Sequence, residues 1–146
     1  MTKRLIAGCV VSCGLLAGVV AGQTAGKPQT INGLQVTVTK LDRAEKASLR
    51  DCPPGTNTVS AVQRPGDELA VVTVNFKVLP DFKPVMMKRP TATATDDKVY
   101  NTSVQFVDVG SVPEYSCTFT FRVPEGTKLK SLQIETATFD LSSLSK

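Results

Sequence analysis

Several stretches of the chain alternate apolar and polar residues, the pattern of β-strands that bury one face. The clearest alternation runs over residues 69–79, where the even-numbered positions from Ala70 to Val78 are apolar. Residues 34–39 and 115–123 alternate in the same way. These patterns predict three amphipathic strands whose apolar faces meet in one core. In the strand over residues 69–79, we expect the even-numbered side chains to face that core.

Weaker patterns predict the remaining strands. Residues 91–95 and 99–100 flank the Asp96-Asp97-Lys98 turn and are expected to form a hairpin. Residues 104–109 are expected to form a short strand, and residues 129–139 a single final strand.

The turn signals are the Asn32-Gly33 pair and the irregular region 43–67. Asn-Gly favours a type I′ turn, in which both central residues need positive φ. Within 43–67 the alternation breaks up around two Pro-Gly turns, and residues 44–49 are open to interpretation as a short helical turn.

Short strands separated by turns indicate the fold class. No stretch of ten or more residues has a convincing helical period, and no internal repeat or second domain is visible. We expect an all-β chain whose residues 30–146 form an antiparallel, immunoglobulin-like β-sandwich of about six to eight strands. Residues 23–29 are expected to be a flexible lead.

The first 22 residues have the anatomy of an export signal. Lys3 and Arg4 precede an uncharged apolar run over residues 5–21, and small residues lead to a cleavage site before Gln23. Two alternatives stay open: a retained membrane anchor, and a lipoprotein acylated at Cys9 or Cys13. The pattern favours cleavage, so we expect a secreted or cell-envelope protein without a stable transmembrane anchor.

The composition narrows the chemistry further. The chain has no histidine, which excludes Ser-His-Asp and Cys-His catalysis and every zinc site that uses histidine. The 17 basic and 13 acidic residues include Lys3 and Arg4, so the mature part is close to neutral. A nearly neutral charge does not predict nucleic-acid binding, so we expect no nucleic-acid partner. We expect no catalytic residue, metal or cofactor.

Two cysteines follow the signal, Cys52 and Cys117. An even number in an oxidising compartment favours one disulfide, and two buried free thiols are the alternative if the chain is not exported.

The order of these features resembles bacterial secreted domains with a telokin-like immunoglobulin fold, such as the mycobacterial secreted immunogenic proteins. The resemblance covers residues 31–141 and rests on 32–38, 72–76, 96–100 and 112–124. It implies an extracellular module without established catalysis. Tyr115, two residues before Cys117, also resembles the tyrosine corner of immunoglobulin domains, although the core tryptophan of those domains is absent.

Residues 81–90 contain the candidate partner-binding site. Met86 and Met87 are bracketed there by the cations Lys83, Lys88 and Arg89. One interpretation is a surface loop suited to an acidic partner or a lipid headgroup layer. The other is a crossover between sheets whose methionines fill the core.

Acidic residues offer weaker alternatives. Asp96, Asp97 and Asp108 carry the oxygen ligands that calcium prefers, but a solvated turn is the favoured interpretation. The pairs Asp67-Glu68 and Asp42-Glu45 offer the two carboxylates of an acid/base mechanism, but ordinary surface carboxylates are the favoured interpretation.

The sequence therefore favours an exported, non-catalytic interaction module whose partner is an unknown protein or cell-envelope component. A small-ligand or metal-binding carrier is the first alternative, and a carboxylate-based hydrolase the second. The oligomeric state is open.

Overall fold

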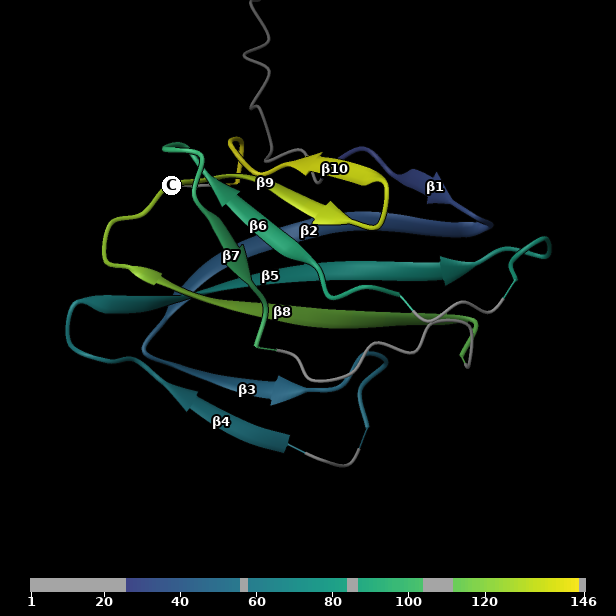
Figure 1. Cartoon of the computed structure of the whole chain (residues 1–146). Helices are drawn as coiled ribbons and strands as arrows, with labels where there is room; N and C mark the ends of the chain where they lie inside the picture. Colours follow the sequence, from purple (N-terminus) through teal and green to yellow (C-terminus); the bar gives the residue numbers. More distant parts are fainter. Residues whose placement is uncertain (1–25, 56–57, 84–86, 104–111, 145–146) are drawn as a thin grey trace, which may run out of the picture.

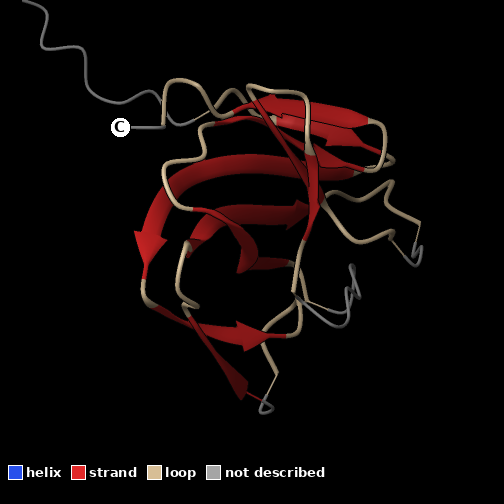
Figure 2. Cartoon of the chain, turned by 60° about the vertical axis from the view of Figure 1, so that its left-hand side comes forward, coloured by secondary structure: helices blue, strands red, loops and turns tan. Residues whose placement is uncertain are grey.

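The structure, a computed structural model, describes residues 26–55, 58–83, 87–103 and 112–144. These residues form ten β-strands: β1 (Gln29–Ile31), β2 (Leu34–Ala44), β3 (Lys46–Arg50), β4 (Thr58–Val62), β5 (Asp67–Val78), β6 (Thr91–Ala94), β7 (Val99–Asn101), β8 (Glu114–Pro124), β9 (Leu129–Ile134) and β10 (Ala137–Asp140). All strand pairs are antiparallel (Figures 1 and 2). The described residues contain no helix, and therefore none that could cross a membrane.

Two four-stranded sheets make the sandwich, and a third sheet lies beside it. The first sheet has the order β1-β2-β5-β8, the second β10-β9-β6-β7, and the third pairs β3 with β4. In Figure 1 the β3–β4 hairpin lies outside the two large sheets, next to β8. The prediction of an all-β antiparallel sandwich is confirmed.

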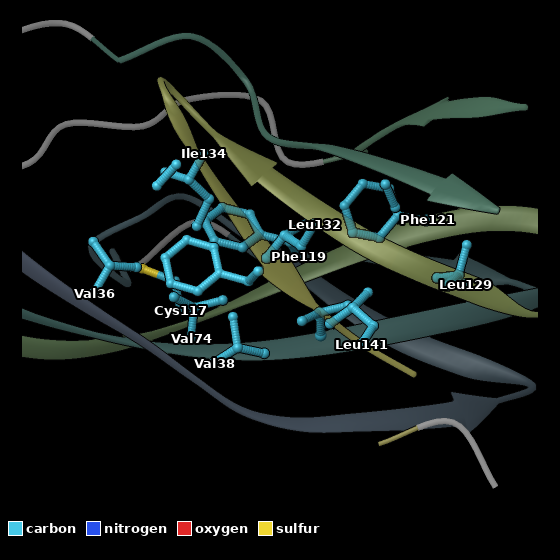
Figure 3. Close-up of a cluster of buried hydrophobic side chains, with 14 of the residues drawn as sticks. Val36, Val38, Val74, Cys117, Phe119, Phe121, Leu129, Leu132, Ile134 and Leu141 are labelled. Carbon is cyan, nitrogen blue, oxygen red and sulfur yellow. The ribbon is translucent and has the colours of Figure 1, made fainter. Parts of the chain in front are cut away.

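The core lies between the two large sheets (Figure 3). On β5 the buried residues include Ala70, Val72, Val74 and Phe76, which confirms the even-numbered core face. The second sheet contributes Leu129, Leu132 and Ile134, among others. Burying each such side chain stabilises the fold by about 1.5–3 kcal/mol, since its apolar surface leaves water.

The β1–β2 turn is the type of turn that its sequence predicts. Asn32 has a φ of 49° and Gly33 a φ of 77°, both in the left-handed region. A Cβ on Gly33 would lie 2.5 Å from the backbone nitrogen of Phe82, so only glycine leaves room for the loop that follows β5.

Replacing Gly33 by alanine is expected to lower the free energy of unfolding by about 2 kcal/mol, because left-handed strain and the clash with Phe82 add. The matched control is Gly126→Ala, since Gly126 has a φ of 79° and open space around it. Urea unfolding should show a loss of about 1 kcal/mol for this control. Equal losses in the two variants would mean that the contact with Phe82 contributes nothing.

Two parts of the sequence interpretation are wrong. The helical turn over residues 44–49 is instead the end of β2 and the strand β3. Lys46, Ala47, Leu49 and Arg50 suit a helix as isolated residues, but pairing with β4 holds this segment extended. Residues 129–139 form two strands instead of one, because the chain reverses at Glu135, whose φ is 49°.

Other boundaries also differ from the sequence prediction. Ten strands occur in the described residues, more than the six to eight expected, because β1, β3 and β4 were not predicted as separate strands and 129–139 is divided. Gln29 already belongs to β1, and the Gly26 backbone N–H donates to the Val38 carbonyl at 2.9 Å. The strand predicted over 104–109 lies outside the described residues.

Candidate functional site

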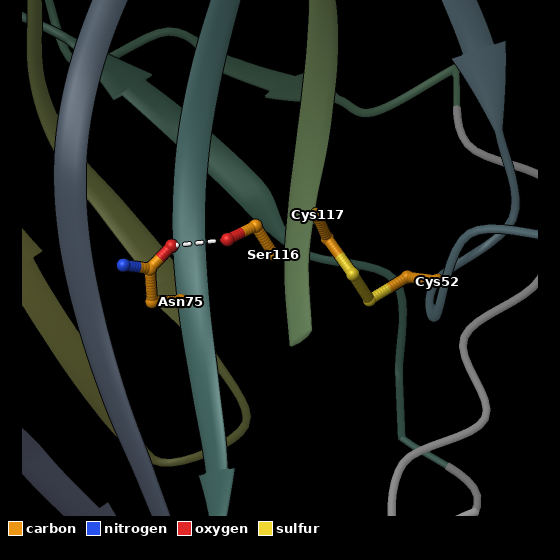
Figure 4. Close-up of a disulfide and its surroundings, with 4 residues drawn as sticks. All are labelled: Cys52, Asn75, Ser116 and Cys117. Atoms are coloured by element: carbon orange, nitrogen blue, oxygen red, sulfur yellow. Dashed lines mark hydrogen bonds between the residues drawn. A yellow bond between two sulfur atoms is a disulfide. The ribbon is translucent and has the colours of Figure 1, made fainter. Parts of the chain in front are cut away.

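A disulfide joins Cys52, which follows β3, to Cys117 in β8 (Figure 4). The two Cα atoms are 5.5 Å apart, and both cysteines are buried. The predicted pairing is confirmed, and it fastens the β3–β4 hairpin to the sandwich at one point. Tyr115, two residues before Cys117, stacks on Phe76 with 5.3 Å between ring centroids.

Lys83, Met87, Lys88 and Arg89 lie on the loop between β5 and β6, which leaves β5 at the right-hand end of Figure 1. Lys83, Lys88 and Arg89 are exposed. Met87 is half-buried and packs against the core, so the core interpretation fits this methionine. Met86 lies outside the described residues. We call the three exposed cations the basic loop end.

The loop is attached to the body of the domain at Phe82 and at Lys88. The Lys88 backbone N–H donates to the Glu135 carboxylate in the β9–β10 turn. Phe82 donates its backbone N–H to the Leu79 carbonyl at 3.0 Å and packs against the core. These contacts hold the backbone at Phe82 and Lys88, next to the cations, and such attachment reduces the entropy lost on binding.

The aspartates of the β6–β7 turn are paired with cations. Asp96 lies 3.2 Å from Lys98, and Asp97 pairs with Lys130. Hydrogen bonds from the Lys98 side chain and backbone lower the pKa of Asp96, and the Asp96 carboxylate raises the pKa of Lys98. Asp108 lies outside the described residues.

Within the described ranges, no group of three histidine, cysteine or acidic side chains is placed to hold a metal ion. Two of the four carboxylates of the acid/base alternative have cationic partners. Glu68 lies 2.8 Å from the Arg43 guanidinium, and Asp42 lies 2.9 Å from the Lys40 ammonium.

A cleft of about 390 Å³ between β3 and the outer face of the first sheet was not predicted from the sequence. Its lining includes Lys46, Ser48 and Arg50 from β3, with Ser116 and Thr118 from β8. The alternation of polar and apolar residues over 46–50 could have predicted this strand. These residues pair with 58–62, and the resulting hairpin places β3 beside β8.

Comparison with known proteins supports the fold alone. No protein-family model matches the chain, and no curated protein matches its sequence. A crystal structure of an uncharacterized β-sandwich protein from Clostridium difficile 630 is similar, with a TM-score of 0.51 and 8% sequence identity. The match covers 80% of this chain and 89% of that chain. The fold and this comparison together define the fold class of the protein, an antiparallel β-sandwich.

Proposed function

We propose that this domain is an exported, non-catalytic interaction module, similar to the secreted telokin-like immunoglobulin domains that its sequence resembles. The basic loop end is its binding site, and a protein or cell-envelope component with an anionic surface is its partner. The observation that supports the proposal is the opposite placement of apolar and cationic side chains in one loop. Met87 packs against the core, whereas Lys83, Lys88 and Arg89 are exposed to solvent.

The chemistry of the loop favours an anionic partner. Lys83 and Lys88 have no ion pair with an acid among the described residues, so their charges are available to a ligand. The carboxylate of Glu135 accepts the hydrogen bond of the Lys88 backbone N–H. Complementary charge raises association rates and selects partners, and attachment of the loop lowers the entropic cost.

Reversing both charges in the variant Lys83→Glu/Lys88→Glu is expected to reduce partner capture by at least about tenfold, because attraction becomes repulsion. The immobilised mature domain would be exposed to cell-envelope extract, and the retained partner quantified by mass spectrometry. The control is Lys27→Glu/Lys128→Glu, which makes the same change of net charge at two exposed lysines elsewhere.

Stability should be unaffected in both variants, since exposed charges contribute little to it. Equal capture by wild type and the Lys83→Glu/Lys88→Glu variant would remove the basic loop end as the binding site. An equal loss in the control variant would show that net charge alone, and no particular site, governs capture.

A further inference from the structure

Strand β4 has one paired edge and one open edge. Among the described residues, β4 pairs with β3 alone, and in Figure 1 it lies on the side of β3 that faces away from β8. Its five residues include no charge and no proline, and Val59 and Val62 are 54% and 52% exposed. An uncharged open strand edge is a template for another strand.

The other edges of the described sheets are short, partly covered or charged. Strands β1 and β7 have three residues each. The Thr138 carbonyl of β10 accepts a hydrogen bond from the Gln29 side chain at 2.8 Å. On β8 the Thr120 carbonyl accepts from the Ser103 backbone N–H at 2.8 Å. Among the described edge strands of five or more residues, β4 is the one without a charge or a proline, since β3 contains Lys46 and Arg50 and β8 contains Glu114, Arg122 and Pro124.

The register of the hairpin shows which backbone groups face the open edge. The Gln63 N–H donates to the Glu45 carbonyl at 2.7 Å, which makes this a hydrogen-bonded pair of the antiparallel ladder. Such pairs alternate along a ladder, and the β3–β4 register has no bulge. The opposed Ser48 and Ser60 are therefore a non-hydrogen-bonded pair, and the N–H and C=O of Ser60 point to the open edge.

The same alternation directs the N–H and C=O groups of Thr58 and Val62 outward. The Val62 carbonyl accepts a hydrogen bond from the Arg122 guanidinium at 3.0 Å, and its second lone pair can accept another. Together these three residues present a row of backbone groups with which a further strand can pair.

The exposed face of the hairpin is cationic. It comprises Lys46, Ser48, Arg50, Thr58, Ser60 and Val62. Lys46 stands opposite Val62 and Arg50 opposite Thr58, and neither cation has an ion pair within the described residues. An added strand would lie two strand spacings, roughly 10 Å, from β3, which long side chains on both strands can bridge.

We propose that the open edge of β4 binds an extended polypeptide segment in which acidic residues alternate with apolar ones. Backbone pairing to β4 gives affinity, Lys46 and Arg50 select acidic residues on one face, and Val59 contacts apolar residues on the other. A second copy of this chain fits less well, because it would place two cationic faces side by side. This site is separate from the basic loop end and does not depend on it.

The test uses a fluorescent, end-blocked peptide of alternating glutamate and valine, with binding followed by anisotropy. Ser60→Pro removes the N–H that faces the open edge without taking a hydrogen bond from the β3–β4 ladder. We expect it to weaken binding by at least about tenfold. Ser48→Pro is the matched control, since its lost N–H points away from β4, and it should bind normally.

Charge gives an independent comparison. Lys46→Glu/Arg50→Glu should also lose the glutamate–valine peptide, and a lysine–valine peptide should fail to bind the wild type. Hydrogen exchange on the wild type covers the case in which a proline variant does not fold. The peptide should slow exchange of the Thr58, Ser60 and Val62 amides, and those of Val59 and Ala61 should change little.

Three results would overturn the proposal: no binding of the peptide to the wild type, unchanged binding by a folded Ser60→Pro variant, or protection confined to other strands. If sedimentation shows a dimer of the wild type and a monomer of the Ser60→Pro variant, the open edge of β4 binds a second copy of the chain, and the proposal of an acidic peptide partner is wrong.

Discussion

Removing the Cys52–Cys117 disulfide is expected to lower the free energy of unfolding by about 4 kcal/mol. The two cysteines are 65 residues apart, so the bond closes a long loop and limits the conformations of the unfolded chain. Both cysteines are buried, and within the described residues their bond is the one covalent cross-link, apart from the main chain itself, between the β3–β4 hairpin and the sandwich. A change of this size is a large fraction of the stability of a domain of this length.

The measurement is urea unfolding of the oxidised protein and of the double variant Cys52→Ser/Cys117→Ser. Reduced and alkylated wild type serves as a second sample, because it separates loss of the bond from the effect of the substituted side chains. A loss of less than about 1 kcal/mol in both samples would contradict the expected constraint.

Replacing Phe76 by alanine is expected to cost about 3–5 kcal/mol of stability, which is typical of a fully buried phenylalanine. Phe76 has no exposed surface, and it lies at the centre of an aromatic cluster. Its ring stacks on Tyr115 and meets the edge of Phe119, with 6.2 Å between the latter centroids. The substitution removes both contacts and leaves a cavity between the sheets.

Val99→Ala is the control, because Val99 is apolar but 60% exposed on β7. It should change the unfolding free energy by less than about 0.5 kcal/mol. A similar small change for Phe76→Ala would mean that the two sheets do not pack tightly around this ring.

The parts of the fold that the sequence predicts are those where one strand face is wholly apolar. On β5 the alternation from Ala70 to Phe76 leaves one possible inward face, since a shift by one residue would bury Asn75 and Lys77. Residues 46–50 carry no such constraint, because only Ala47 and Leu49 are apolar and both stay half-buried. Their strand conformation depends on a distant partner, β4, which local propensity does not reveal.

The same difference between local pattern and long-range contact explains which parts of the candidate site the sequence predicts. The cations of the loop after β5 are visible as a cluster in the sequence, and the predicted disulfide follows from cysteine number. The inward packing of Met87 and the contact of Lys88 with Glu135 join residues far apart in the chain, so only the fold reveals them. The cleft beside β3 depends in the same way on a hairpin that the sequence did not predict.

The central claim, binding through the basic loop end, is tested most directly by hydrogen exchange of the mature domain, alone and in complex with the partner recovered from the envelope extract. The account predicts slower exchange in peptides that cover residues 81–90 and in the adjoining turn at Glu135. Protection confined to other parts of the domain, with residues 81–90 exchanging as fast as in the free protein, would contradict it.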